Sequence, residues 1–95
     1  MFDRTFFERQ FSDQVQAFCR EQKIAAPVVE LLLDDGSVLR LQTIAQIRES
    51  WLALKARPDN AELRLILCPY FSIKRITFSK PSSEKEMVLS FPPKP

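Results

Sequence analysis

The first quarter of the chain carries apolar residues at the spacing of a helix. Between Thr5 and Lys23 they recur at steps of three and four, which places them on one helical face: Phe7, Phe11, Val15, Phe18 and Cys19. Thr5 followed by Glu8 has the form of a capping box, and Ser12 offers a later start. Pro27 disfavours helical geometry in the residue before it, so the predicted helix covers about residues 5–23.

After residue 27 the pattern changes to short runs of strand-forming residues separated by turns. The first run is 28–33, and Asp34-Asp35-Gly36-Ser37 follows it as the clearest hairpin signal, because Gly36 is the only glycine and tolerates a positive φ. Further strands are predicted at 38–42, 51–55, 63–68 and 73–78, with Trp51 in the core and a turn at 57–60.

These reversals favour antiparallel pairing, and short strands must curl to bury one face. The predicted fold class is mainly β with an N-terminal α-helix, in which a strongly bent five-stranded antiparallel sheet forms a small barrel over about residues 28–79. One domain is expected over 1–80, followed by a C-terminal tail over 81–95. Within the tail, Met87-Val88-Leu89 is apolar enough to dock on the domain, and one way to do so is as a short added strand near 87–91.

Composition narrows the classes of function. The chain has 95 residues, which is enough for one core, and its apolar runs are far shorter than the roughly 20 residues of a membrane-spanning helix, so no membrane partner is expected. Its charged N-terminus lacks the features of a secretory signal, which predicts a cytoplasmic protein. The formal net charge of +2 restricts any binding of nucleic acid to a local patch.

The side chains of common catalytic and metal sites are scarce. The sequence has no histidine, two isolated cysteines and one glycine, which disfavours general-base catalysis by histidine, a cysteine-rich zinc site and a glycine-rich phosphate loop. We therefore expect a non-enzyme, with no metal, no cofactor and no small-molecule substrate.

The fourth predicted strand is apolar on both faces, although an antiparallel strand with one wet face alternates. Two interpretations stay open: the N-terminal helix covers the second face, or another copy of the protein does. Under the second, the fourth and fifth strands pair between protomers, and the candidate interface residues are Leu63, Leu65, Ile66, Cys68, Ile73, Ile76 and Phe78.

The turn Pro69-Tyr70-Phe71-Ser72 places aromatic rings between these two strands. Such rings stack on unpaired bases when they lie on a loop, and nearby cations contact phosphates, which makes Arg48, Tyr70, Phe71 and Lys74 candidate RNA-binding residues. Packing of the rings into the core is the favoured alternative.

The order of these elements resembles the Sm-like proteins, which share an SH3-like small barrel, and is closest in layout to the bacterial RNA chaperones of the Hfq group. The resemblance covers about residues 11–80 and rests on 15–21 as the helix, Leu33-Asp34-Asp35-Gly36 as the first hairpin, 51–55 as the third strand and the turn before Ile73. It implies a homo-oligomeric ring joined by the fourth strand of one protomer and the fifth of the next.

The resemblance also implies where single-stranded RNA would meet the ring, and it adds Ser50 to the candidate site. Most of the specific contacts differ in this chain. The uridine-contacting glutamine of the family falls on Phe11, its pore-side aromatic on Ser50, its Tyr-Lys-His turn on Pro69-Tyr70-Phe71 and its adenine-stacking aromatic on Leu32. The expected function is an Sm-like ring that binds single-stranded RNA; the alternative is a structural or protein-interaction ring without a nucleic-acid role.

Overall fold

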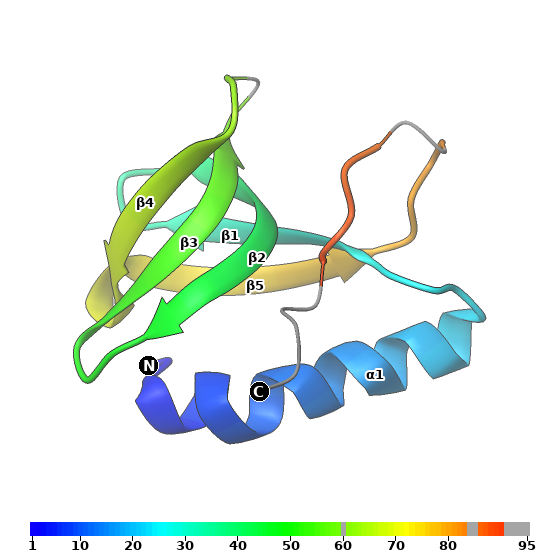
Figure 1. Cartoon of the computed structure of the whole chain (residues 1–95), viewed down its shortest axis with the longest axis horizontal. Helices are drawn as coiled ribbons and strands as arrows, with labels where there is room; N and C mark the ends of the chain where they lie inside the picture. Colours follow the sequence, from blue (N-terminus) through cyan, green and yellow to red (C-terminus); the bar gives the residue numbers. More distant parts are fainter. Residues whose placement is uncertain (60, 84–85, 91–95) are drawn as a thin grey trace.

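The computed structural model describes residues 1–59, 61–83 and 86–90, in which a helical segment precedes five strands (Figure 1). The elements are a π-helical turn η1 (Phe6–Gln10), helix α1 (Phe11–Gln22), strands β1 (Val28–Leu33), β2 (Val38–Ile47), β3 (Trp51–Pro58) and β4 (Arg64–Pro69), a 3-10 turn η2 (Tyr70–Ser72) and strand β5 (Ile73–Ser79). The predicted mainly β fold, with an N-terminal helix and a five-stranded antiparallel sheet, is confirmed.

The strands form one sheet in the order β4-β3-β2-β1-β5, so β4 and β5 are its two borders. The register shifts between Leu41 and Thr43 and between Ile44 and Gln46 where β2 pairs with β3, and again between Leu32 and Leu33 where β1 pairs with β5. Such bulges bend a sheet, and Figure 1 shows β2, β3 and β4 crossing over β1 and β5. The sheet nevertheless stays open, because β4 and β5 are not paired with each other.

Two strands are longer than the sequence predicted. Strand β2 reaches Ile47 instead of ending near residue 42, because its bulges let it bend and remain paired with β3. Strand β3 includes Arg57 and Pro58, so the prediction that a turn begins at Arg57 is wrong. Pro58 lies opposite Leu39 at the end of the strand, where a proline is tolerated, and the chain turns at Asp59, whose φ is 48°.

The hairpin between β1 and β2 forms where the sequence predicts it. Gly36 has a φ of 88°, and its N–H donates to the carbonyl oxygen of Leu33 at 3.0 Å. The Asp35 carboxylate accepts hydrogen bonds from the hydroxyl of Ser37 at 2.6 Å and from its backbone N–H at 2.8 Å, and these bonds hold the Asp35 pKa below its ordinary value. Asp35 and Ser37 therefore serve the turn.

The helix ends as predicted but begins differently. Thr5 makes no side-chain capping bond, so the predicted capping box is wrong; Asp3 Oδ1 instead accepts the N–H of Phe6 at 2.9 Å. Glu8 forms an ion pair with Arg4 at 3.3 Å. At the other end Lys23 adopts a left-handed conformation with a φ of 56°, and the N–H of Ile24 donates to the carbonyl oxygen of Cys19 at 3.0 Å.

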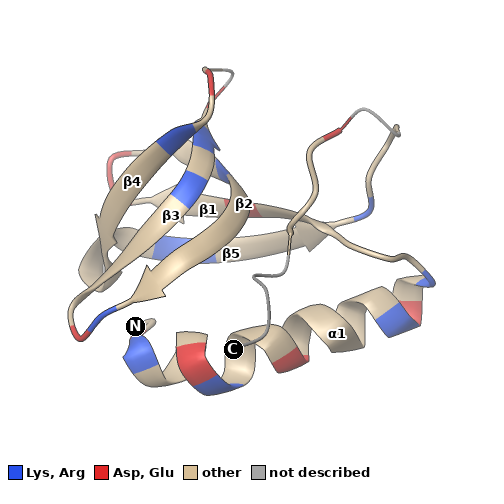
Figure 2. Ribbon diagram, viewed as in Figure 1, with Lys and Arg blue, Asp and Glu red and all other residues tan. Residues whose placement is uncertain are grey.

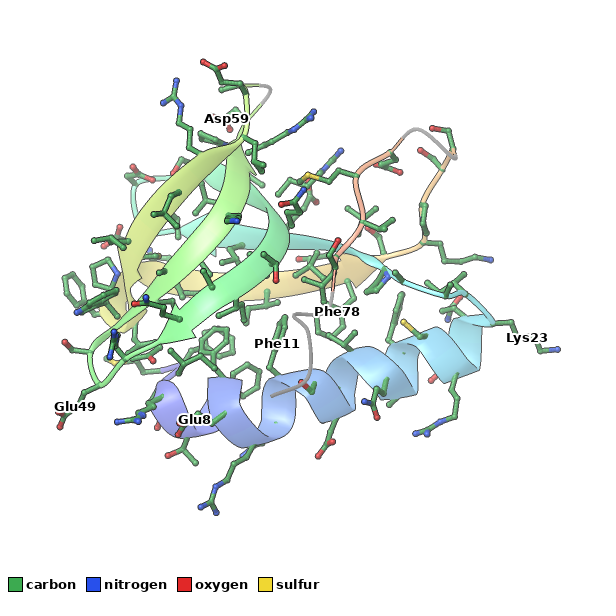
Figure 3. All side chains as sticks on the ribbon, in the orientation of Figure 1. Glu8, Phe11, Lys23, Glu49, Asp59 and Phe78 are labelled. Atoms are coloured by element: carbon green, nitrogen blue, oxygen red, sulfur yellow. The ribbon has the colours of Figure 1, made fainter. Side chains whose placement is uncertain are left out.

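The core lies between the predicted helical face and the inner face of the sheet. Phe7, Phe11 and Val15 are buried, and Figure 3 shows Phe11 and Phe78 between the helix and the sheet, with ring centroids 6.0 Å apart. The helix therefore does not cover the second apolar face of β4, where Leu63, Leu65 and Leu67 stay exposed. The interpretation that the N-terminal helix covers this face is therefore wrong.

The segment after β5 returns to the domain. Leu89 is buried in the core; its N–H donates to the carbonyl oxygen of Pro27 at 2.8 Å, and the N–H of Ser90 donates to that of Gln42 at 2.6 Å. Glu86 forms an ion pair with Arg40 at 3.3 Å. Residues 86–90 dock without forming a strand, and residue 91 of the expected strand lies outside the described residues. In the described part of the chain, every helix is too short or too polar to cross a membrane.

We expect Leu89→Ala to lower the free energy of unfolding by about 2 kcal/mol, because it removes a buried side chain from the core. Denaturant titration followed by circular dichroism measures the change. The control is Ser90→Ala, which alters an exposed side chain and keeps the backbone bond to Gln42. Equal stability of the two variants would contradict a structural role for the docked segment.

Candidate nucleic-acid interface

The predicted RNA-binding residues meet at one end of the sheet. The hydroxyl of Tyr70 donates to the carbonyl oxygen of Arg48 at 2.5 Å, and the N–H of Tyr70 donates to that of Ser50 at 3.3 Å. These bonds join η2 to the loop between β2 and β3; Phe71 follows Tyr70 directly, and Lys74 is the second residue of β5. We call the surface formed by Arg48, Ser50, Phe71 and Lys74 the end surface.

Tyr70 supports this surface from inside. Its side chain is 5% exposed and its ring stacks on Phe7, with the centroids 5.8 Å apart. Burial raises the pKa of the Tyr70 phenol above its ordinary value. The ring thus has no free face for a base, and its hydrogen bond to Arg48 holds the neighbouring loop in position.

Phe71 has the opposite environment from its neighbour. It is 70% exposed, which is unusual for a phenylalanine and leaves its ring open to a stacking partner. The 3-10 turn causes the difference, because it directs successive side chains of η2 in different directions. The aromatic pair in the sequence is thus one core residue and one surface residue.

The charged groups of the end surface differ in their availability. Lys74 is exposed. Arg48 is also exposed, but its Nε donates to Gln46 Oε1 at 3.2 Å, and its guanidinium lies 6.0 Å from the centre of the Trp51 ring. Trp51 itself is only half-buried, so its prediction as a core residue is wrong. Arg48 and Trp51 form a polar-aromatic pair at the rim of the sheet.

A hollow that the sequence did not predict adjoins Lys74. It has a volume of about 470 Å³, and its lining includes Phe2, Phe6, Gln10 and Lys74. The rings of Phe2 and Phe6 lie 4.9 Å apart. Together these side chains offer apolar ring surface, an amide that both donates and accepts hydrogen bonds, and an ammonium group. The sequence signal for this hollow was the cluster of phenylalanines at the start of the chain. The helical stripe explained Phe7 and Phe11 in this cluster but left Phe2 and Phe6 without a role.

The electrostatics around this hollow are mixed. Figure 2 shows basic and acidic residues side by side at the N-terminal end of the helix, and Figure 3 shows Glu8 on the helix and Glu49 on the loop between β2 and β3. Asp3 also lines the hollow, with its carboxylate engaged by the N–H of Phe6. No continuous basic surface surrounds the predicted site in the described residues.

The candidate interface residues of β4 and β5 fall into three groups. Leu65 is 64% exposed and Leu63 is 40% exposed, whereas Ile66, Ile76 and Phe78 are half-buried along the inner face of the two borders. The other two are buried in their own chain; they are Cys68 and Ile73. Burial raises the pKa of the Cys68 thiol above its ordinary value.

Comparisons with known proteins assign no relative: no family model, no curated protein and no solved structure matches the chain. In the described residues, no group of three or more histidine, cysteine, aspartate or glutamate side chains gathers as a metal site.

The neighbouring aromatic residues of η2 provide a matched pair for mutation. We expect Tyr70→Ala to lower the free energy of unfolding by about 3–5 kcal/mol, because it removes a buried ring and the bond to Arg48. Phe71→Ala is expected to change it by less than about 0.5 kcal/mol. Thermal unfolding of both variants measures the difference, and a stable Tyr70→Ala protein would contradict the packing of Tyr70.

Proposed function

We propose that the protein is an Sm-like protein whose bent sheet, a small barrel of the SH3-like class, assembles into a homo-oligomeric ring that binds single-stranded RNA. One observation carries the proposal: β4 and β5 are the two unpaired borders of one strongly bent antiparallel sheet. A contact between unlike borders is head-to-tail, and a head-to-tail contact closes into a ring when the rotation between neighbours allows it.

The chemistry of the borders supports pairing between copies. An unpaired border presents backbone N–H and C=O groups that bind another strand. Proteins that avoid such contact place prolines or inward charges within the border strand. In β4 the one charged residue is Arg64 at its start, and the residues from Leu65 to Cys68 are apolar. Its proline, Pro69, is the last residue of the strand.

The inner faces of both borders carry half-buried apolar side chains. Ile66 of β4 and Ile76 and Phe78 of β5 are each half-buried against the core of their own chain. Pairing of β4 with the β5 of a second copy would bring these side chains together and extend the core across the border. The buried apolar area would then favour association.

The RNA part of the proposal depends on the end surface and the hollow beside it. The exposed ring of Phe71 offers a stacking platform, Lys74 offers a contact for phosphate, and the hollow lined by Phe2, Phe6 and Gln10 has room for a base. A ring would repeat these groups around its axis, so that one strand of RNA spans several copies.

A second candidate function is a structural or protein-interaction ring that binds no nucleic acid. The low net charge of +2 favours it, and so do three acidic residues: Asp3 in the hollow beside Lys74, Glu8 on the helix and Glu49 beside Arg48 and Ser50. Their carboxylates repel the phosphates of RNA. The salt dependence of RNA binding separates the two candidates.

Assembly is tested by sedimentation at micromolar concentration. We expect the wild-type chain to sediment as a closed oligomer and Ile66→Lys to sediment as a monomer, because a charge on the inner face of the border opposes pairing. The control is Lys55→Ala on β3, an inner strand of the sheet, which should leave sedimentation unchanged. Circular dichroism checks that both variants fold. A monomeric wild-type protein would contradict the proposed ring.

RNA binding is tested by fluorescence anisotropy with labelled oligo-U and oligo-A over a range of salt concentrations. We expect the affinity to fall with salt, with a logarithmic slope of about −0.7 for each phosphate neutralised. Phe71→Ala should weaken binding about tenfold through lost stacking, and Lys74→Ala should make the slope shallower. Arg20→Ala, on the exposed face of the helix, is the control. Absence of binding at low salt would leave the ring without an RNA role.

A further inference from the structure

The outer face of β4 and the residue just before the strand carry a row of exposed leucines. The sequence predicted Leu63 and Leu65 as residues of the contact between borders, whereas the inner-face contact proposed above uses Ile66 in their place. Leu63, Leu65 and Leu67 are 40%, 64% and 61% exposed. Leu65 lies opposite Lys55 of β3, and Leu67 lies opposite Ala53, which is itself buried. The row lies on the side of the sheet that faces away from the core, with a small buried alanine beside Leu67 and a lysine beside Leu65. We call it the leucine row.

A basic column runs beside the leucine row. Lys55 and Arg57 of β3 are both exposed and lie on the same outer face, because they alternate with the buried Leu54 and Ala56. In the next strand, Arg40 lies opposite Arg57, but it is neutralised by Glu30 at 3.1 Å and by Glu86 at 3.3 Å. Within the described residues, no carboxylate forms an ion pair with Lys55 or Arg57.

Ring assembly would leave this face accessible. Strand pairing uses backbone groups in the plane of the sheet, whereas side chains stand roughly perpendicular to that plane. The β5 of a neighbouring copy would place Arg75 and Thr77 on the same outer side, because both alternate with the inward Ile76. The leucine row would then lie between two columns that contain cations.

We infer that the leucine row and the column of Lys55 and Arg57 form a docking site for an acidic amphipathic helix of a partner protein. At about 3.3 Å per residue, the extended chain from Leu63, just before β4, to Leu67 spans about 13 Å, which matches about two and a half turns of a helix. Apolar side chains of the partner would pack on the row, and its carboxylates would pair with Lys55 and Arg57. Charge complementarity of this kind selects the partner and orients it.

The shape and chemistry of the site favour a peptide over other occupants. Bases stack best on aromatic rings, whereas the three leucines of the row are aliphatic and Arg57 alone among the residues of the proposed site offers a guanidinium plane. A membrane surface gains only about 1 kcal/mol per cation, so two cations beside three leucines provide weak anchoring. A second copy of the chain would have to present an acidic apolar face, but the exposed face of its helix is of mixed charge, with Arg9 and Arg20 beside Glu8, Asp13 and Glu21.

Binding of a designed peptide tests the inference. The probe is a labelled helical peptide of about 14 residues with leucines on one face and glutamates on the others, and its partner peptide carries lysines in place of the glutamates. We expect the acidic peptide to bind the full chain with a Kd of about 10 μM and the basic peptide to bind at least about tenfold more weakly.

Variants assign the binding to the site. The double variants Leu65→Ser with Leu67→Ser, and Lys55→Glu with Arg57→Glu, should each weaken binding of the acidic peptide by at least about tenfold. Arg20→Glu is the charge control, and Phe71→Ala checks that the end surface is not involved. Circular dichroism confirms folding and sedimentation reports assembly separately, so a protein that fails to form rings still tests this site.

Three outcomes would overturn the inference. They are equal affinity for the acidic and basic peptides, unchanged affinity in both double variants, and no binding of the acidic peptide at about 1 mM. Oligo-U and vesicles that contain anionic lipid are added as competitors. If either one occupies the face, with loss in the same double variants and no binding of the peptide, then the partner is not an acidic helix.

Discussion

The packing of the helical aromatic face against the bent sheet is the interaction on which the other features depend. Phe7 stacks on Tyr70, and Phe11 and Phe18 both lie against Phe78. These contacts cover the inner face near β5 and η2, and they hold Tyr70 where its hydroxyl reaches the carbonyl oxygen of Arg48. The same packing leaves the outer face of β4 bare, because one short helix covers only one side of the sheet.

Local chemistry explains which parts of the fold the sequence predicts. The helical face and the hairpin at Gly36 depend on neighbouring residues, and both form as expected. The length of β2 depends instead on bulges in its pairing with β3, and the residue types at 43–47 give no signal of these bulges. The start of the helix differs from the prediction although Asp3 and Thr5 are both good capping residues, because Asp3 and not Thr5 accepts the N–H of Phe6.

The candidate site shows the same division. Sequence reasoning grouped Arg48, Ser50 and Tyr70, and backbone and hydroxyl bonds bring them together. It did not separate Tyr70 from Phe71, because the direction of each ring depends on a single 3-10 turn. It also missed Gln10, which is exposed at the end of η1 and lines the same hollow as Lys74. Such juxtapositions are tertiary, so a linear pattern carries no signal for them.

The three surfaces of the domain differ in the groups that they present, and this limits how they share functions. The borders offer backbone hydrogen bonds, the end surface and the hollow beside it offer aromatic rings, an amide and an ammonium group, and the outer face offers leucines beside two cations. Each surface fits a different kind of ligand: a strand at the borders, a nucleic acid at the end surface and an acidic helix at the outer face. Binding at one surface leaves the polar groups of the other two in contact with water. Occupation of one surface therefore does not exclude occupation of the others, and assembly through the borders would multiply the remaining two. A weak contact at either surface would then gain strength from repetition around the ring.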